Sequence, residues 1–331
     1  MYVPPFKITA RIINLIAEIS AMVERFAIRM EQDDALLLRK INRIKTIQGS
    51  LAIEGNTLTE NQITDLIDGK HVVAPLREIQ EVRNAIRAYD LYPQLDPYSV
   101  KDLLKAHGVM MEALADDAGR FRQCGVGVFA GTKPIHVAPP AQRVPALMAD
   151  LFEWLQKADD HLLIKSCVFH YEFEFIHPFS DGNGRTGRLW QSLILGKLHP
   201  IFEHLPIENM VYANQQGYYD AINRSTAATD SGIFVEFMLQ EICNTLKSRQ
   251  GEPLTANRRS IAQENTQEIA QEKILNAIRS NPHITRRELA RLSGFSEDSI
   301  KYRLQKLIRQ GVIKHIGATK AGEWIILNES R

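Results

Sequence analysis

The sequence predicts a mainly α-helical protein, and three observations support this prediction. Apolar residues recur at helical spacing along most of residues 8–249. The best β-hairpin candidate of this region is GVGVFAGTKPIHVAPP, residues 125–140, where apolar residues alternate with glycine and polar residues. Near the C-terminus, three short amphipathic helices and two alternating strands form the pattern of a winged helix-turn-helix. The 331 residues are enough for two or three domains.

The individual helices follow from apolar periodicity and from capping residues. Residues 8–48 predict two helices, after which Gly49 and the pair Gly55-Asn56 interrupt the pattern. Thr59 and Gln62 have the spacing of a capping box, which indicates that another helix begins there. Further helices are expected over residues 76–92, 98–115, 143–157, 160–176, 184–198, 214–227 and 231–249.

The C-terminal part has a different organisation. Residues 249–269 are polar and predict a linker, and residues 270–331 predict the winged helix domain. Its helices are expected in QEKILNAIRSN, in TRRELARLSG with Thr285 as N-cap and Gly294 as stop, and in SEDSIKYRLQKLIRQG with Ser296 as N-cap. VIKHIG and EWIILN are expected to pair as the wing.

Composition limits the possible partners and the compartment. A formal net charge of +1 predicts no overall attraction to nucleic acid or to acidic membranes, so a basic surface has to be local. The N-terminal stretch does not have the pattern of a signal peptide, and no window reaches the roughly 18 apolar residues of a membrane span. Cys124, Cys167 and Cys243 are too few and too far apart for a disulfide framework or a zinc cluster. We therefore expect a soluble cytoplasmic protein without a membrane partner.

The stretch EFIHPFSDGNGRTGRLWQ, residues 174–191, combines chemically active residues with a glycine-rich turn. Pro178 disfavours helical geometry at His177, so the preceding helix is expected to end near this point. Gly182 and Gly184 then lead into a new helix, whose N-terminus presents free N–H groups and the positive end of the helix dipole. Such a turn is suited to binding an anion.

The side chains of this stretch suit chemistry on a polyphosphate. Arg185 and Arg188 are three residues apart on one helix face, and both can bind phosphate oxygens. Asp181 would oppose a phosphate unless a divalent cation such as Mg²⁺ lies between them. Histidine titrates near neutral pH, so His177 can take a proton from a hydroxyl. The alternative is a plain turn between two helices with solvated arginines.

HPFSDGNGRTGR resembles the signature of the Fic (filamentation-induced-by-cAMP) family, His-x-Phe-x-Asp/Glu-Gly-Asn-Gly-Arg-x-x-Arg, at every specified position. The resemblance implies an enzyme that transfers AMP from ATP to a Ser, Thr or Tyr hydroxyl of a target protein. It implies that His177 is the general base, that Asp181 holds Mg²⁺, and that Phe179 is a core anchor. The nucleotide-binding residues implied are Gly182, Asn183, Gly184, Arg185 and Arg188. Kinase, UMP and phosphocholine transfer also occur on this fold, but the full motif favours AMP.

The wider resemblance covers about residues 1–245. It implies an N-terminal helical region over residues 1–95 and a Fic-type helical core over residues 96–248 with a β-hairpin flap. In the family, the flap aligns a target segment as an added strand. The flap residues are Gly125, Val126, Gly127, Val128, Phe129, Ile135, His136 and Val137. The alternative is an ordinary surface hairpin.

NQQGYYDAIN resembles the adenine-side helix of the family and implies that Tyr218 and Tyr219 line a base pocket. Aromatic pairs at a helix start also occur as core residues, and this alternative stays open. Ser225 and Thr226 stand where some relatives place an asparagine, so the remaining base contacts are not implied.

A second motif lies in SLAIEGN, residues 50–56. From the pattern alone, Glu54 is a solvated surface charge. The stretch nevertheless resembles the inhibitory motif of the family, Ser/Thr-x-x-x-Glu-Gly/Asn, through Ser50, Glu54 and Gly55. Its place before the core is that of the class with an N-terminal inhibitory helix, which implies that Glu54 pairs with Arg188 and blocks the γ-phosphate. In some relatives this glutamate orients a water that removes AMP, so de-AMPylation is a second activity left open.

The C-terminal domain is locally basic. Residues 270–331 contain 12 Lys and Arg against 6 Asp and Glu, a net charge of +6, which leaves −5 on residues 1–269. Candidate phosphate contacts on its second and third helices are Arg286, Arg287, Arg291, Lys301, Arg303, Lys306 and Arg309, and candidate groove contacts are Ser296, Ser299 and Tyr302. A domain used for protein contact or dimerisation is the alternative.

Two functions from different classes follow. The first is a protein adenylyltransferase that uses ATP and Mg²⁺ and is inhibited by its own Glu54. The second is a DNA-binding transcriptional regulator whose Fic domain serves as a nucleotide sensor. An intact His177 favours the enzyme, because nucleotide binding alone does not need a base. The partners considered are a target protein, duplex DNA and a second copy of the chain as a homodimer.

Overall fold

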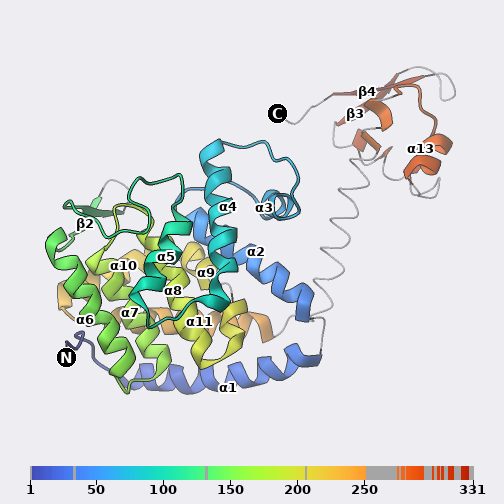
Figure 1. The fold of residues 1–331 in the computed structure, drawn as a ribbon. Helices are drawn as coiled ribbons and strands as arrows, with labels where there is room; N and C mark the ends of the chain where they lie inside the picture. The colour runs from blue at the N-terminus through green and yellow to red at the C-terminus, as the bar shows by residue number, and fades with distance from the viewer. Residues whose placement is uncertain are drawn as a thin grey trace. The chain divides into compact units, whose positions relative to one another are not determined.

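The computed structural model describes residues 2–32, 35–130, 133–205 and 207–250, and then residues 274–275, 277–279, 281–293, 300–301, 304–305, 307–308, 312–316 and 322–327. The chain divides into two compact units, Met1–Gly251 and Glu252–Arg331. The described elements are mostly helices, and each unit has a two-stranded antiparallel sheet (Figure 1). The predicted mainly α-helical fold is confirmed. The finer boundaries at residues 95 and 248 stay predictions.

The helices of the first unit confirm the periodicity of the sequence. They are α1 (Ala10–Gln32), α2 (Ala35–Ile53), α3 (Glu60–Ile67), α4 (Leu76–Asp90), α5 (Val100–Met110), α6 (Val144–Lys157), α7 (Leu162–Ile176), α8 (Asn183–Leu198), α9 (Ile207–Ala213), α10 (Gln215–Ala228) and α11 (Gly232–Gln250). Short 3-10 helices cover Tyr92–Gln94, Ala141–Arg143 and Pro200–His204. Neither these nor α9 were predicted. The capping box of Thr59 and Gln62 is present at the start of α3.

Two helices end at places that differ from the prediction. α2 continues through Gly49 to Ile53, although Gly49 was expected to interrupt the helix. A Cβ atom at Gly49 would lie 2.5 Å from Oδ1 of Asn209, so this glycine permits close packing of α2 against α9. α5 ends at Met110, several residues early, and the following turn places Ala113 at a positive φ of 57°.

The centre of the first unit is formed by α7 and α8, which the other helices surround (Figure 1). Most residues of both helices are buried, so α7 has no solvated polar face. Any charged residue on α7 is therefore transferred out of water and has to find its partner inside the protein. This is the physical setting of the candidate site, which lies at the turn between the two helices.

A β-hairpin lies between α5 and α6, as the alternation of residues 125–140 predicted. β1 (Gly127–Ala130) and β2 (Lys133–Val137) pair antiparallel, with Gly127 opposite Val137 and Ala130 opposite Lys133. The register shifts between Val128 and Phe129, as at a β-bulge. The hairpin prediction is confirmed, and residues 131 and 132 at its tip lie outside the described residues.

The second unit has the elements expected of a winged helix where the structure describes it. α13 (Arg286–Ser293) begins after Thr285, whose hydroxyl accepts a hydrogen bond from the N–H of Glu288 at 3.3 Å, which confirms this N-cap. β3 (Ile313–Ile316) and β4 (Glu323–Ile326) pair antiparallel as the wing. The core is formed by Ile274, Ile278, Ile284, Leu289, Ile300, Leu304, Leu307 and Ile313.

Several predictions fall outside the described residues. These are the linker from residue 251 onward, the stop at Gly294, the N-cap at Ser296, and the candidate contacts Ser299, Tyr302, Arg303, Lys306 and Arg309. None of the described helices is long and apolar enough to cross a membrane.

Candidate active site

The turn between α7 and α8 gives His177 and Gly182 unusual backbone conformations. α7 ends at Ile176, and His177 follows in the left-handed region with φ 50° and ψ 62°. Gly182 precedes α8 with a φ of 79°. A Cβ atom at Gly182 would lie 2.5 Å from Sδ of Met111, so both the backbone and the space require glycine here.

The turn between α7 and α8 is held in place by its own side chains and by contacts with α5. Asn183 accepts a hydrogen bond from the N–H of Phe179 and donates one to its carbonyl, both at 2.9 Å. The buried Phe179 ring stacks on His107, with ring centres 3.6 Å apart. Nδ1 of His107 accepts from the N–H of Gly119 at 2.9 Å, so Nε2 carries the proton and donates to the carbonyl of Asp181 at 3.0 Å. Phe179 is the expected core anchor, whereas the predicted phosphate contact of Asn183 stays a prediction.

Arg188 is almost fully buried and contacts the last turn of α2. Its Nη2 donates to Oε1 of Glu54 at 2.8 Å and to the carbonyl of Ser50 at 2.9 Å, and its Nε donates to Oγ of Ser50 at 3.3 Å. Burial lowers the pKa of Arg188, but the negative charge of Glu54 and smaller contributions outweigh it, so the pKa is raised. Arg188 therefore stays charged and is tied to the residues of the SLAIEGN motif.

The Glu54 carboxylate lies over the N-terminal turn of α8. A Cβ atom placed on Gly184 would be 2.5 Å from Oε1 of Glu54 and 2.8 Å from Nη1 of Arg188. The N-terminus of a helix is a natural anion site, because its first N–H groups have no partner within the helix. Glu54 thus approaches the place where a phosphate is expected to bind. Gly55 ends this segment with a φ of 91°.

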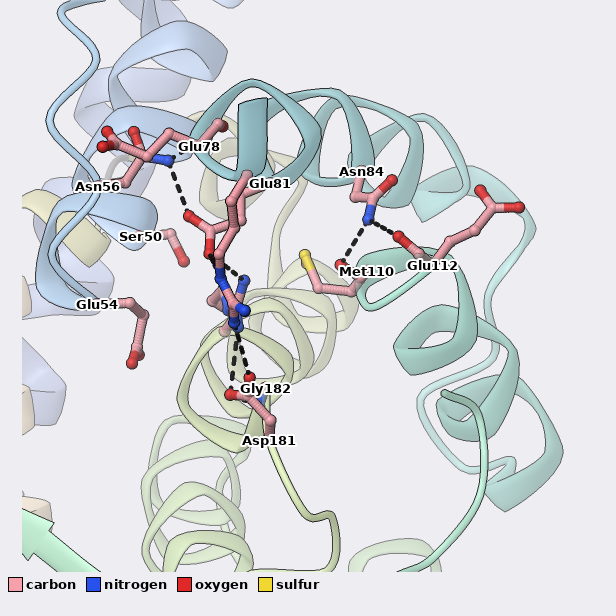
Figure 2. A network of polar contacts seen from close by, with 12 residues as sticks. Ser50, Glu54, Asn56, Glu78, Glu81, Asn84, Met110, Glu112, Asp181 and Gly182 are labelled. Atoms are coloured by element: carbon pink, nitrogen blue, oxygen red, sulfur yellow. Dashed lines mark hydrogen bonds and ion pairs between the residues drawn. The ribbon is translucent and has the colours of Figure 1, made fainter. Parts of the chain in front are cut away.

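A second group of polar contacts connects α2 and α4 to the other side of the turn (Figure 2). Arg185 donates through Nη2 to Oδ1 of Asp181 at 3.4 Å, and its Nη1 lies 3.9 Å from Oε1 of Glu81. Arg77 lies 3.5 Å from Oδ2 of Asp181, and Asn56 donates to Oε2 of Glu81 at 2.9 Å. Nε and Nη1 of Arg185 are buried and have no hydrogen-bond partner in the described part of the chain. Phosphate binding by these donors stays a prediction.

The residues present fit a magnesium ion that binds together with a nucleotide. The Asp181 side chain is 48% exposed, so an ion can reach it from solvent. Within the described ranges, no group of three or more His, Cys, Asp or Glu side chains could hold a metal without further ligands. Mg²⁺ commonly binds through one or two carboxylates, phosphate oxygens and water, so Asp181 would supply a carboxylate and a bound nucleotide the phosphate oxygens.

His177 is positioned by contacts on both its ring and its backbone. Nδ1 lies 3.4 Å from the backbone carbonyl of Glu174 and 3.9 Å from Oε2 of the same residue. The carbonyl of His177 accepts a hydrogen bond from Nε of Arg122 at 2.7 Å. Nδ1 therefore faces the protein, and the role of His177 as the base stays a prediction.

Arg122 was not singled out from the sequence, although it connects the hairpin to the catalytic turn. In addition to His177, its guanidinium donates to the carbonyls of Cys124 at 2.9 Å, Pro139 at 2.6 Å and Ile176 at 3.3 Å. Cys124 and Pro139 flank the two strands of the hairpin. In the sequence, a single arginine before a glycine-rich stretch looks like a surface residue. Only the folded structure shows that Arg122 is buried.

Three glutamates were also not predicted, of which Glu172 and Glu208 are buried and Glu174 is mostly buried. Burial raises the pKa of Glu172, Glu174 and Glu208 to about 7. Glu208 on α9 accepts hydrogen bonds from the hydroxyls of Tyr89 at 3.0 Å and Ser192 at 3.3 Å. The alternation FEFEFI in an otherwise apolar helix was the signal that could have identified the two glutamates of α7.

The remaining predicted positions are only partly described. Tyr218 is buried, and its hydroxyl lies 2.8 Å from Nε2 of His170, whereas Tyr219 is half-buried. Their assignment to a base pocket stays a prediction. Gly125 and Val126 lie just before β1, and the side chains of Val128, Phe129, Ile135, His136 and Val137 lie outside the described residues.

The fold and site define a helical protein with an anion-binding turn, a histidine at its edge and a carboxylate over it. Residues 97–195 match the model of the Fic/DOC family, and residues 268–314 match a model described as winged helix-turn-helix DNA-binding. The crystal structure of a Fic family protein from Desulfovibrio desulfuricans G20 is 38% identical to this chain, covers 100% of both chains and has a TM-score of 0.72. The chain therefore belongs to the Fic family.

Curated relatives carry an activity in their names. "Protein adenylyltransferase Fic" of Nematostella vectensis is 28% identical over 205 residues, which are 58% of this chain and 45% of that protein. "Protein adenylyltransferase fic-1" of Caenorhabditis elegans is 33% identical over 162 residues, 44% of this chain and 30% of that protein. The chain thus spans less than half the length of these two relatives. The solved Fic-1 structure from C. elegans, at 20% identity, a TM-score of 0.58, and coverage of 73% of this chain and 72% of that chain, supports the fold.

Proposed function

We propose that this protein is a protein adenylyltransferase that transfers AMP from ATP to a hydroxyl of a target protein and is held inactive by Glu54. The observation that carries the proposal is the placement of the Glu54 carboxylate, paired with Arg188 at 2.8 Å, over the N-terminal turn of α8. A bound triphosphate needs both the arginine and the turn. The names of the curated relatives support the transfer of an adenylyl group.

The reaction follows from the positions of the side chains. Nε2 of His177 takes the proton of the target hydroxyl, and the oxygen attacks the α-phosphorus of ATP. A new P–O bond forms to the target while the bond from the α-phosphorus to the oxygen bridging to the β-phosphate breaks. Pyrophosphate leaves with that electron pair, and the proton passes from His177 to solvent. Because the protein forms no covalent intermediate, most of the rate enhancement comes from positioning and charge neutralisation.

The phosphates are bound by the N-terminal turn of α8 and by its arginines. The N–H groups after Gly182 and the buried donors of Arg185 face the α- and β-phosphates, and Arg188 binds the γ-phosphate once Glu54 withdraws. Asp181 would hold Mg²⁺, which neutralises phosphate charge when it is bound. The hairpin β1–β2 is the proposed docking strand for the target segment.

The contacts of Glu54 and Ser50 with Arg188 support an inhibited state. Arg188 has no free approach to a γ-phosphate while Glu54 and Ser50 bind it. Removal of AMP from a modified target, with Glu54 orienting a water, is a second reaction compatible with this placement.

The test compares wild-type protein with Glu54→Gly and with Glu54→Gly/His177→Ala. Each is incubated with Mg²⁺ and ATP labelled on either the α- or the γ-phosphate, with and without cell lysate. We expect label from the α-phosphate to enter protein at least about tenfold faster in Glu54→Gly and to vanish in the double variant. Glu112→Gly, an exposed glutamate of the same unit, is the matched control and should behave as wild type. Label only from the γ-phosphate, or equal α-label in wild type and Glu54→Gly, would contradict the proposal.

A second candidate function is DNA binding through the C-terminal unit. The family match over residues 268–314 favours it, and Arg286, Arg287 and Arg291 are exposed on α13. Counterion release predicts that affinity for duplex DNA falls steeply as salt rises. Reversing Arg286 and Arg287 to Glu should lower both the affinity and the salt dependence, whereas reversing the exposed Lys101 and Lys105 of the first unit should not. No retention of the wild-type protein on DNA at low salt would eliminate this function.

A further inference from the structure

α7 carries two glutamates, two residues apart, of which Glu172 is buried and Glu174 is mostly buried, and they face different surroundings. Glu172 accepts a hydrogen bond from the hydroxyl of Tyr2 at 3.1 Å. Glu174 instead faces the candidate active site, with its side chain 12% exposed and Oε2 3.9 Å from Nδ1 of His177. Its second oxygen, Oε1, is buried and has no hydrogen-bond partner among the residues that the structure describes. Glu174 is thus a carboxylate placed beside the ring of the base.

The position of Glu174 is set by close packing against α8. A Cβ atom on Gly187 would lie 3.0 Å from Oε1 of Glu174, so this carboxylate approaches α8 more closely than most side chains approach a Cβ atom. Ionisable side chains from several elements interact electrostatically with Glu174. They are His177 from the turn, Arg188 from α8, Glu54 from the end of α2, and Tyr218 and Tyr219 from α10. The carboxylate therefore interacts electrostatically with both the base and the proposed γ-phosphate arginine.

The charge of Glu174 depends on whether Glu54 is present. Burial raises the pKa of Glu174 to about 7, the charge of Arg188 lowers it, and the charge of Glu54 raises it. When Glu54 withdraws from Arg188, one negative charge that opposes ionisation is removed. The ionised form of Glu174 is then favoured until the negative γ-phosphate takes the place of Glu54 at Arg188.

We propose that Glu174 is a positioning residue for His177. The backbone carbonyl of Glu174, 3.4 Å from Nδ1, accepts Nδ1–H and leaves Nε2 unprotonated toward the target hydroxyl. The carboxylate, 3.9 Å from Nδ1, stabilises this tautomer and the imidazolium that forms when Nε2 takes the proton. A buried carboxylate behind a catalytic histidine has this role in other enzymes, where it orients the ring and does not itself accept the proton. No atom of Glu174 forms or breaks a bond. This inference rests on the proposed function.

The first experiment uses Glu54→Gly as the background and adds Glu174→Gln. At saturating ATP and pH 7.5, kcat for AMP incorporation should fall about tenfold or more, while the KM for ATP should change less than about twofold. Glu172→Gln is the matched control, because it makes the same change in a buried carboxyl of the same helix that does not contact His177. Glu174→Asp keeps the charge and should retain an intermediate kcat.

The second measurement separates orientation of the base from a purely structural effect. Without the carboxylate the imidazolium is less stable, so the acidic limb of the rate–pH profile should move to lower pH in Glu174→Gln and stay in place in Glu172→Gln. The titration midpoint of the His177 Cε1–H proton, assigned by NMR with the His177→Ala variant, should move in the same direction. This readout does not require activity.

The outcomes distinguish the inference from the proposed function. If Glu54→Gly itself incorporates no AMP from α-labelled ATP, the proposed function fails before Glu174 is tested. If Glu54→Gly is active but Glu174→Gln matches Glu172→Gln in kcat, in pH profile and in the His177 midpoint, the inference alone is overturned. A kcat loss accompanied by an equal loss of ATP affinity would also overturn it, because that result indicates a role in nucleotide binding.

Discussion

Oε1 of Glu54 and Nη2 of Arg188 lie 2.8 Å apart, although the two residues are separated by 134 positions in the sequence. The pair joins the C-terminal end of α2 to the helix that begins at the glycine-rich turn. Charge-assisted hydrogen bonds of this kind are among the stronger polar contacts in proteins, and this one is largely shielded from water on the arginine side. Under the proposed function, activation requires that the end of α2 move or that Glu54 be removed.

Ser50 is expected to restrain Arg188 less strongly than Glu54 does. Ser50→Ala removes the hydroxyl that accepts from Nε at 3.3 Å but keeps the backbone carbonyl that accepts at 2.9 Å. One hydrogen bond is worth about 0.5–1.5 kcal/mol, so the rate of AMP incorporation should rise about two- to tenfold, less than in Glu54→Gly. Ser50→Thr, which keeps the hydroxyl, should remain as inhibited as wild type. A larger rise in Ser50→Ala than in Glu54→Gly would refute this ranking.

Asn56 should influence inhibition without contacting Arg188. Its side chain donates to the carbonyl of Glu78 at 3.1 Å and to Oε2 of Glu81 at 2.9 Å. These bonds attach the end of residues 50–56, the proposed inhibitory segment, to α4. Asn56→Ala loses both bonds, so we expect several-fold faster AMP incorporation in the same labelling assay.

Asn84→Ala is the control for this prediction. Asn84 also lies on α4 and donates two hydrogen bonds, to the carbonyls of Met110 and Glu112, but it does not contact the inhibitory segment (Figure 2). The Asn84→Ala variant should lower the free energy of unfolding without raising the rate of AMP incorporation. An equal rise in the rate of AMP incorporation in both variants would show that a general loss of stability, and not the loss of the contact between Asn56 and α4, controls the rate.

Arg122→Lys should destabilise the first unit and slow catalysis. A lysine has a single nitrogen and cannot replace the forked guanidinium that donates to four carbonyls, including those of His177 and Pro139. We expect a loss of about 2 kcal/mol, measured from urea unfolding, and lower AMP incorporation in the Glu54→Gly background. Arg120→Lys, an exposed arginine two residues earlier, should change neither quantity. Unchanged unfolding of Arg122→Lys would be inconsistent with the contacts described.

His170 makes the stability of the first unit depend on pH. Burial, followed by the charge of Arg188, lowers the pKa of His170 from 6.5 to about 3. Between these two values the unfolded chain binds a proton that the folded protein does not, so stability falls as pH drops below 6.5. At pH 5 the expected loss is about 2 kcal/mol relative to pH 7.

The contribution of His170 can be isolated by substitution. Buried glutamates with raised pKa values act in the opposite direction over the same range, so the comparison is between variants and not between pH values alone. From pH 7 to pH 5, wild type should lose about 2 kcal/mol more than His170→Gln, measured by urea unfolding at each pH. His71→Gln, at an exposed histidine, should follow wild type. Parallel pH curves for wild type and His170→Gln would rule out the buried neutral histidine.

Local patterns predicted the elements well because their causes lie within a few residues. The capping residues Thr59 and Thr285 act on N–H groups three positions away, and both helices begin where expected. Gly49 was misjudged because its role depends on α9, which has no strong apolar period and packs against it from 160 positions away.

The sequence by itself determined the chemical groups of the candidate site. It placed His177, Asp181 and the two arginines within one turn and a helix start, and the spacing of Ser50 and Glu54 indicated a second motif. Only the tertiary structure decided which distant groups meet: Glu54 with Arg188, and Glu81 with Arg185. The physical reason is that spacing along the chain sets the order of the groups, whereas burial and partner charges, which set their protonation and orientation, arise from helices far apart in the sequence.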